Sequence, residues 1–490
     1  MLKSTLLLSV ALAGSLHVNG QKAPAPLAPL PTPAQVEQMK METYAFIHFT
    51  TNTFLNLEWG YGDAAPSVFN PDTLDCGQWV KTLLQGGLKG IIFTAKHHDG
   101  FCLWPTKYTD YSISASPYRH GKGDAVGELA AECRKQGMEF GIYLSPWDRH
   151  QASYGTPEYV DYYKKQLREL LTQYGPFFEV WFDGANGGDG YYGGAREKRT
   201  IDKVHYYNFP ALFKMLNDAD PKCIIHTDGG PGSRWIGNEN GVAGETDWAF
   251  LTDKHMIPAG VEDHERVLGQ GDADGSHWVH GEADVSIRRP NWFWSTTNDK
   301  LVLSPEQLVD LYFKSVGRNA TLLLNVPVNI HGKIAKKDSL ALVGYREIID
   351  KTFAVNLLTK AKVTASTTRG KAFRPANVVD GKYDSYWATG DGVNKGSLTF
   401  RLRQPQTFNC LMLQEYIPLG QRVKRFRVEY LDRSGKWQTI DAGQTTTVGY
   451  KRLLRFRPVS TSQVRVKFLD ARGPLCINAV GAYRLPINKN

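Results

Sequence analysis

Cysteine is scarce in this sequence, and its few copies form no recognised pattern. Six cysteines are spread over 490 residues without a CxxC pair, which excludes a disulfide scaffold and argues against a zinc site. The first four fall in or beside predicted strands and helices, so buried thiols are expected there. Cys410 and Cys476 stay a candidate pair within an exported second domain.

Nucleotide-binding signatures are missing too. No GxGxxG opens a helix after the first predicted strand, and GxxxxGK[ST] does not occur. These absences argue against the α/β folds that cradle phosphates.

The chain also lacks an apolar run of membrane-spanning length. The run Leu6–Ala13 follows Lys3 and is too short for a bilayer, so residues 1–20 are predicted to be a cleaved secretory signal. No cysteine follows it, which argues against a lipid anchor, and residues 21–32 are a Pro-rich extended tether. We expect an exported protein, periplasmic or secreted, with no transmembrane segment and no nucleic-acid partner.

Length and charge divide the remainder. The chain is too long for one core, and from Thr352 onward it has 24 Lys and Arg against 8 Asp and Glu, a balance of +16 within a total of +9. Several arginines there fall on or beside predicted strands and suggest acidic partners such as sulfated or sialylated glycans. The alternative is an ordinary solvated face. The set is Arg401, Arg403, Arg422, Arg425, Arg427, Arg455, Arg457 and Arg465.

Residues 33–352 alternate between predicted strands and helices. The strands are continuous apolar runs, as in a parallel sheet buried on both faces, and the length favours a (β/α)8-like TIM barrel. Residues 353–490 instead show short alternating runs with turns between them, which predicts a β-sandwich. The predicted barrel strands are 44–50, 90–95, 138–144, 178–182, 223–227 and 321–325.

Polar residues gather where these barrel strands end. Asp183 closes the apolar run 178–182 and precedes Gly184, at the rim where a barrel carries its chemistry. His48, the pair His97 and His98, and Tyr143 stand at or near the ends of earlier strands. Hydrogen bonding to substrate hydroxyls fits these histidines better than zinc, because a third ligand at a recognised spacing is lacking.

A tryptophan-rich set accompanies these groups and suggests stacking faces for a sugar. Sugar hydrolysis needs two carboxyl groups. Glu239 is the best second candidate after Asp183, because it lies in a Gly/Asn-rich loop beside Trp235, where an indole neighbour and partial burial favour an acid. Glu245 and Glu282 are its rivals.

Five motifs in order resemble glycoside hydrolase family 29, the α-L-fucosidases, over residues 33–327: His48, Glu58-Trp59-Gly60, His97–Phe101, Gly141–Tyr143 and Val180–Gly184. The resemblance implies that Asp183 is the nucleophile of a retaining mechanism without a catalytic cofactor. It implies that fucose contacts His48, Glu58, Trp59, His97, His98 and Tyr143. Trp181, within the last motif, is a further candidate for substrate binding. The segment 235–239 is similar to the acid/base segment of the branch acting on α-1,3/1,4 linkages, and Trp292 to that branch's late aromatic.

One feature departs from the family pattern. A Gly/Tyr-rich loop after Asp183 stretches its separation from Glu239 to 56 residues, so Glu245 and Glu282 stay open as alternatives for the acid/base.

Residues 355–485 resemble a discoidin-type module, like family 32 carbohydrate-binding modules, through 376–381 and Tyr386-Trp387. Such modules often hold a structural calcium, here expected near Asp380. The expected activity is therefore exo-acting release of fucose from fucosylated oligosaccharides or glycoconjugates. A related sugar such as L-galactose, or a non-catalytic glycan-binding protein, are the alternatives.

Overall fold

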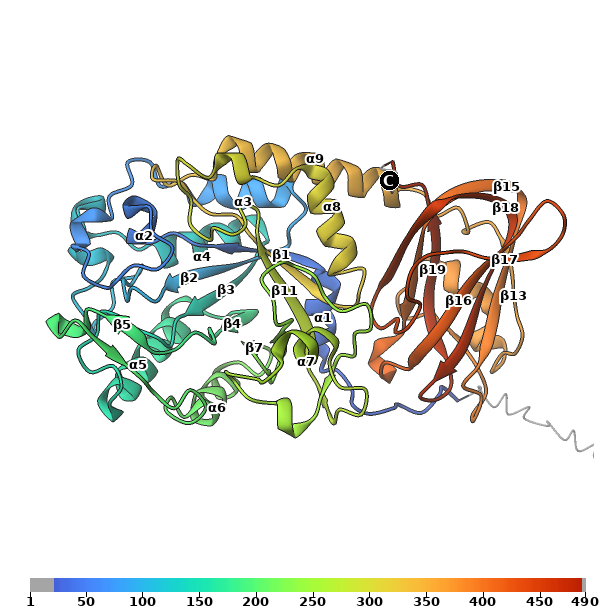
Figure 1. Ribbon diagram of the computed structural model, residues 1–490, viewed down its shortest axis with the longest axis horizontal. Coiled ribbons are helices and arrows are strands. Elements are labelled where there is room, and N and C mark those ends of the chain that lie inside the picture. The colour runs from blue at the N-terminus through green and yellow to red at the C-terminus, as the bar shows by residue number, and fades with distance from the viewer. Residues whose placement is uncertain (1–21, 487–490) are drawn as a thin grey trace, which may run out of the picture.

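The computed structural model describes residues 22–486, and Figure 1 shows two domains side by side. The predicted signal, residues 1–20, lies outside the described residues. Residues 22–32 run along the second domain, where the guanidinium groups of Arg422 and Arg472 each donate to a carbonyl of this stretch at 2.7 Å, those of Ala25 and Ala28. Within the described part of the chain, no helix is long and apolar enough to cross a membrane.

The amino-terminal domain is a closed barrel of parallel strands, as the sequence predicts. Around the barrel the order is β1, β12, β11, β8, β7, β4, β3, β2, which returns to β1. The strands are β1 (Thr43–Ile47), β2 (Gly90–Lys96), β3 (Glu139–Leu144), β4 (Glu179–Trp181), β7 (Ile224–Thr227), β8 (Ser233–Trp235), β11 (His280–Ser286) and β12 (Thr321–Asn325).

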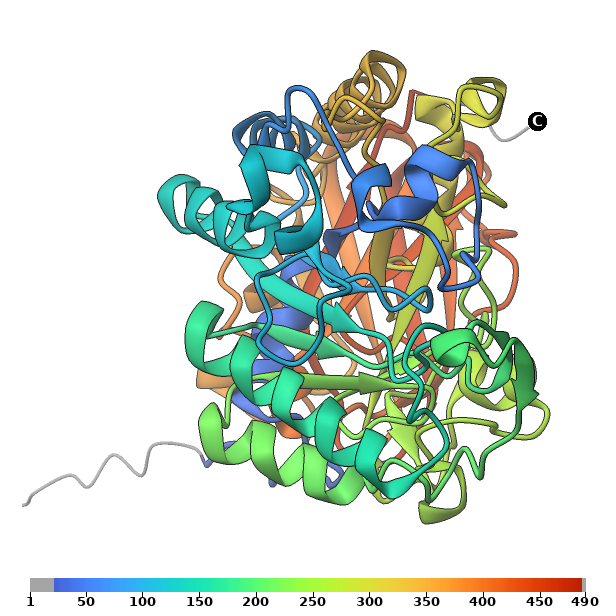
Figure 2. The ribbon, with the colours of Figure 1, turned by 90° about the vertical axis from the view of Figure 1, so that its left-hand side faces the viewer.

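Most helices cover the outside of the barrel, which Figure 2 shows in front of the second domain. The helix α1 (Pro33–Met41) instead lies at the amino-terminal end of the barrel, where its Gln38 donates to buried Glu179 at 2.7 Å. Two helices begin at capping boxes that the sequence reveals, with Thr32 and Ser304 as the caps and a glutamine three residues on. The helices are α1 (Pro33–Met41), α2 (Thr51–Leu55), α3 (Cys76–Gln85), α4 (Ala125–Gln136), α5 (Pro157–Tyr174), α6 (Phe209–Ala219), α7 (His264–Gln270), α8 (Pro305–Lys314) and α9 (Lys336–Phe353).

Two barrel strands, β8 and β11, escape the sequence pattern. Only residues 228–232 separate β7 from the parallel strand β8, so no helix announces the new strand. Strand β11 reads His-Gly-Glu-Ala-Asp-Val-Ser and lacks an apolar run, because Glu282 and Asp284 are buried inside the barrel. The predicted strands put Glu239 after the fifth of them, residues 223–227, but in the structure it follows the sixth barrel strand, β8.

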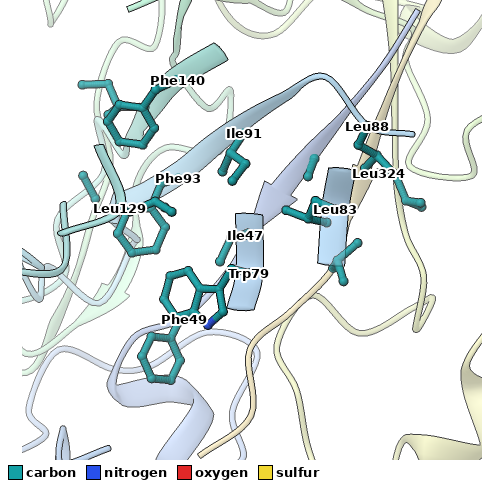
Figure 3. Close-up of a cluster of buried hydrophobic side chains, with 14 of the residues drawn as sticks. Ile47, Phe49, Trp79, Leu83, Leu88, Ile91, Phe93, Leu129, Phe140 and Leu324 are labelled. Carbon is teal, nitrogen blue, oxygen red and sulfur yellow. The ribbon is translucent and has the colours of Figure 1, made fainter. Parts of the chain in front are cut away.

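The main core lies between the barrel wall and its helices. Figure 3 shows Ile47, Ile91 and Phe93 of β1 and β2 packed against Trp79 of α3 and Leu129 of α4, all fully buried. Alternate residues of the same strands, such as Phe46 and Ile92, face a second cluster inside the barrel with Tyr143 and Trp181. Burial on both faces explains the continuous apolar runs.

The second domain is an antiparallel sheet of long, bulged strands, consistent with the predicted sandwich. Its own core includes Trp387, Phe400, Phe426 and Phe468. All six cysteines are free and buried, so Cys410 and Cys476 do not pair. The strands are β13 (Lys362–Ala365), β14 (Trp387–Ala388), β15 (Gly396–Glu415), β16 (Val423–Leu431), β17 (Trp437–Thr439), β18 (Arg452–Ala471) and β19 (Cys476–Tyr483).

Candidate active site

A cavity of about 370 Å³ opens at the carboxyl ends of the barrel strands. It brings together most of the residues singled out in the sequence. Its walls are formed by Phe46, His48, Trp59, His97, His98, Tyr143, Trp181, Asp183, Gly184, Ala185, Lys203, Asp228, Trp235, Glu239, Gly260, Val261, His264, Asp284 and Trp292.

Asp183 lies two residues after the end of β4, and its side chain is 22 % exposed. The backbone N–H of Ala185 donates to its Oδ1 at 2.6 Å, and the Tyr143 hydroxyl donates to its Oδ2 at 2.9 Å. Burial raises the pKa of Asp183, while these two hydrogen bonds act in the opposite direction because they favour the carboxylate. The bonds fix the carboxylate in one orientation at the cavity wall.

His48 and His98 present unprotonated nitrogens to the cavity. The Ser145 hydroxyl donates to the Trp147 carbonyl, so it accepts from His98 Nδ1 at 2.7 Å and leaves Nε2 free, 3.8 Å from Asp183 Oδ2. The Asn325 amide group donates to two other partners, so its oxygen accepts from His48 Nδ1 at 2.9 Å. Burial lowers the pKa of each histidine to about 3. Both are therefore neutral acceptors for hydroxyl groups.

His97 completes this wall. Its ring centroid lies 4.3 Å from that of His98, so both adjacent histidines turn toward the mouth at the end of β2. Burial lowers the pKa of His97 well below its usual range, and its Nδ1 has no hydrogen-bond partner among the described residues. A polar atom buried at a cavity wall without a partner is a natural contact for a bound hydroxyl.

Aromatic rings form the floor and the mouth. Trp181 is 7 % exposed and stacks on Tyr143, with ring centroids 5.5 Å apart, whereas Trp59 at the mouth is 51 % exposed. Glu58 is not among the cavity-lining residues. Its carboxylate instead accepts from the Asn291 amide at 2.9 Å and from the Trp292 backbone N–H at 2.7 Å. Glu58 thus holds the loop that carries Trp292.

Among the three glutamates weighed as a second carboxylate, only Glu239 lines the cavity. Its side chain is 42 % exposed and accepts a hydrogen bond from Arg289 at 2.8 Å. Glu245 pairs with Arg318 away from the cavity, at 3.2 Å. Glu282 is fully buried beneath Trp181, whose indole N–H donates to it at 2.7 Å.

Four polar residues of the cavity were not singled out in the sequence: Lys203, Asp228, His264 and Asp284. Asp228 follows β7 and precedes two glycines, the same signal that marks Asp183, and it was available in the sequence. Burial, with the nearby Asp183 charge, raises the pKa of Asp228 to about 7. Burial raises the pKa of Asp284 well above its usual range.

The Asp380 loop of the second domain does not gather a carboxylate-rich set. Asp380 is exposed, and its Oδ1 accepts the backbone N–H of Lys382 at 2.9 Å. In residues 22–486 the one group of three or more His, Cys, Asp or Glu that is close enough to hold a metal is Glu179, His226 and Glu282, inside the barrel. Calcium also takes backbone carbonyl oxygens as ligands, so a calcium ion near Asp380 stays a prediction.

A parallel barrel whose rim holds carboxylates, neutral histidines and aromatic rings around one cavity defines a sugar-processing enzyme of the glycoside hydrolase class. Residues 33–345 match the α-L-fucosidase family, and residues 362–479 match the F5/8 type C (discoidin) domain. The chain belongs to the α-L-fucosidases of glycoside hydrolase family 29.

Relatives and solved structures agree with this membership. Alpha-L-fucosidase 1 of Arabidopsis thaliana is 42 % identical, over 94 % of this chain and 88 % of its own. A glycoside hydrolase 29 member from an unknown rumen bacterium is 42 % identical with a TM-score of 0.84, over 95 % of this chain and 79 % of its own. A Ruminococcus gnavus GH29 fucosidase in complex with fucose is 35 % identical with a TM-score of 0.85, over 96 % and 98 %.

Proposed function

We propose that this α-L-fucosidase is exo-acting and retaining, with Asp183 as nucleophile and Glu239 as acid/base. The observation that supports this most is the placement of these two carboxylates in one cavity while Glu245 and Glu282 lie outside it. A cavity of about 370 Å³ suits one terminal sugar with its linkage at the mouth.

Each group has a defined part in this mechanism. An Asp183 oxygen bonds to the anomeric carbon as the bond to the leaving oxygen breaks, and Glu239 gives that oxygen a proton. Glu239 then takes a proton from water, which attacks the same carbon and releases Asp183. The free nitrogens of His48 and His98 accept from fucose hydroxyls, and Trp181 underlies the ring.

Two substitutions separate these roles. Asp183→Ala should lose nearly all turnover and stay folded, with some activity returned by azide. Glu239→Gln should impair oligosaccharide cleavage far more than cleavage of 4-nitrophenyl α-L-fucoside, because a good leaving group needs no proton. The leaving-group contrast in Glu245→Gln or Glu282→Gln instead would reassign the acid/base.

Retention and linkage need their own measurements. Proton NMR of the first-formed sugar should show α-fucose, and initial β-fucose would refute the retaining mechanism. We propose α-1,3/1,4 linkages on the similarity of residues 235–239 and Trp292 to that branch. Faster cleavage of α-1,2 or α-1,6 isomers would contradict this. Activity on an α-L-galactoside equal to that on the fucoside would favour the related-sugar alternative.

We also propose that the second domain holds acidic glycans, at a shallow basic cavity of about 880 Å³. Arg427 of β16 lies directly opposite Lys467 of β18, and like charges in that arrangement repel. Lys467 has Glu429 as a partner at 3.1 Å, but Lys395, Arg425 and Arg427 have no acidic partner within the described chain. Three arginines of the predicted set serve elsewhere: Arg422 is fully buried, Arg455 pairs with Asp310 and Arg465 with Glu429.

The test compares binding of the full chain to sulfated and neutral glycan arrays. Wild type should prefer the sulfated array and lose it at high salt, since exposed charges are screened. Arg425→Ala with Arg427→Ala should abolish the preference, and Arg401→Ala with Arg403→Ala is the control outside the cavity. Equal binding to both arrays, or none, would leave an ordinary charged face.

A further inference from the structure

The loop that carries Glu239 ends against the second domain. Residues 236–249, here called the Glu239 segment, join β8 to β9 (Phe250–Leu251) without a helix or strand. Glu239 near its start lines the cavity, and residues 245–249 at its end contact the second domain. The segment therefore runs from the cavity to the interface between the domains.

Side chains of the second domain form hydrogen bonds with backbone groups at this end of the segment. The Gln421 amide N–H donates to the Asp247 carbonyl at 2.9 Å, and its oxygen accepts from the Ala249 N–H at 2.9 Å. The Thr447 hydroxyl accepts from the Asp247 N–H at 2.8 Å. Arg452 donates to the Glu245 carbonyl at 2.6 Å. Gln421 thus pairs with the segment as a neighbouring strand would, and these side chains are buried.

The same residues lead back to the strand before Glu239. Asp247 accepts from Arg234 of β8 at 2.7 Å, and both side chains are almost completely buried. Arg234 immediately precedes Trp235, which lines the cavity beside Glu239. Removing the partners of Asp247 would leave a buried ion pair without its backbone support, and such pairs depend on full hydrogen bonding.

Arg318 of the barrel domain also contacts the segment at this interface. Arg318 lies in an isolated bridge with Arg452 and donates to the Ala243 carbonyl at 2.7 Å and to Glu245 at 3.2 Å. Buried Glu415 links the two parts of the second domain that contact the segment. It accepts from the backbone N–H groups of Val423, close to Gln421, and Gly449, close to Thr447.

We propose that the carboxy-terminal domain positions the acid/base, with Gln421 and Thr447 as positioning residues that act through the Glu239 segment. The inference rests on the proposed role of Glu239. It gives the domain a part in proton transfer in addition to any glycan binding. Removing these two side chains should leave the Asp183 side of the cavity intact, because neither of them contacts the groups that donate hydrogen bonds to Asp183.

The test uses the full chain with Gln421→Met and Thr447→Val, both close in shape to the native residues. Each should lower kcat on an α-1,4-fucosyl oligosaccharide by about tenfold, a fraction of what a general acid contributes, and change 4-nitrophenyl α-L-fucoside cleavage less than about threefold. The control is Arg455→Met, which breaks the contact with Asp310 at the same interface without touching the segment. It should preserve the ratio between the substrates.

The outcomes separate the two proposals. Equal losses on both substrates, or no loss in either variant while Glu239→Gln shows its contrast, would overturn the positioning role alone. If Glu239→Gln shows no contrast between the substrates but Gln421→Met does, the acid/base assignment fails. The second domain would then position another group of the Glu239 segment. Melting temperatures near that of wild type show that a contrast does not come from unfolding.

Discussion

Tyr143→Phe should move the acid limb of the pH profile upward by about one pH unit. The Tyr143 hydroxyl donates to Asp183 at 2.9 Å and so stabilises the carboxylate, against burial, which raises the pKa of Asp183. A hydrogen bond to a charged group contributes about 1.5–3 kcal/mol, and 1.36 kcal/mol corresponds to one pKa unit. Because the Asp183 side chain is 22 % exposed and keeps its hydrogen bond from the Ala185 N–H, we use the lower end of this energy range, which corresponds to about one pKa unit.

The sign follows from the form that reacts. Only the carboxylate attacks, so a higher pKa removes activity at a higher pH on the acid side. The assay is kcat/KM for 4-nitrophenyl α-L-fucoside across the acidic range. Tyr163→Phe is the control, since that buried hydroxyl donates to the Leu144 carbonyl at 2.6 Å rather than to Asp183. An unmoved limb in Tyr143→Phe, or an equal shift in the control, would refute the reasoning.

Three further substitutions test other parts of the structure. Trp59→Ala should raise KM with little change in melting temperature, because half of the ring is already in water. Asp338→Ala should cost about 3 kcal/mol in urea unfolding, the lower end for breaking a buried ion pair, because the Arg288 guanidinium loses its buried partner but keeps Asp299. Exposed Lys351→Ala should cost under about 0.5 kcal/mol. Glu282→Gln should flatten the pH dependence of stability: burial raises the pKa of Glu282 to about 7 from 4.5 unfolded, so wild-type stability should fall as pH rises through that interval.

The barrel was predictable where strands are apolar and helices separate them. Six strands were located within a few residues, and β12 at its observed bounds. Helix α6 begins only at Phe209, because residues 201–208 connect it to the Gly/Tyr-rich loop. The local sequence pattern predicts a barrel strand only where the strand packs against apolar neighbours on both faces.

The cavity residues that follow apolar strands were equally predictable from the sequence. Asp183, His97, His98 and Tyr143 were found because each ends or lies near the end of such a strand. Lys203 and His264 were not, since they reach the cavity from long connections whose path is set by tertiary contacts. The partners that select the histidine tautomers, Ser145 and Asn325, likewise come from neighbouring strands.

Strand β11 shows why the sequence alone does not reveal which carboxylates line the cavity. Glu282 and Asp284 lie two residues apart and so point to the same side, into the barrel. Two residues along a strand span about 6.6 Å, which is enough to separate successive layers of side chains in a barrel. Asp284 therefore reaches the cavity, while Glu282 lies one layer deeper, under Trp181. Which of the two is exposed to a substrate depends on how β11 pairs with β8 and β12, a register that a strand without an apolar run does not reveal in its sequence.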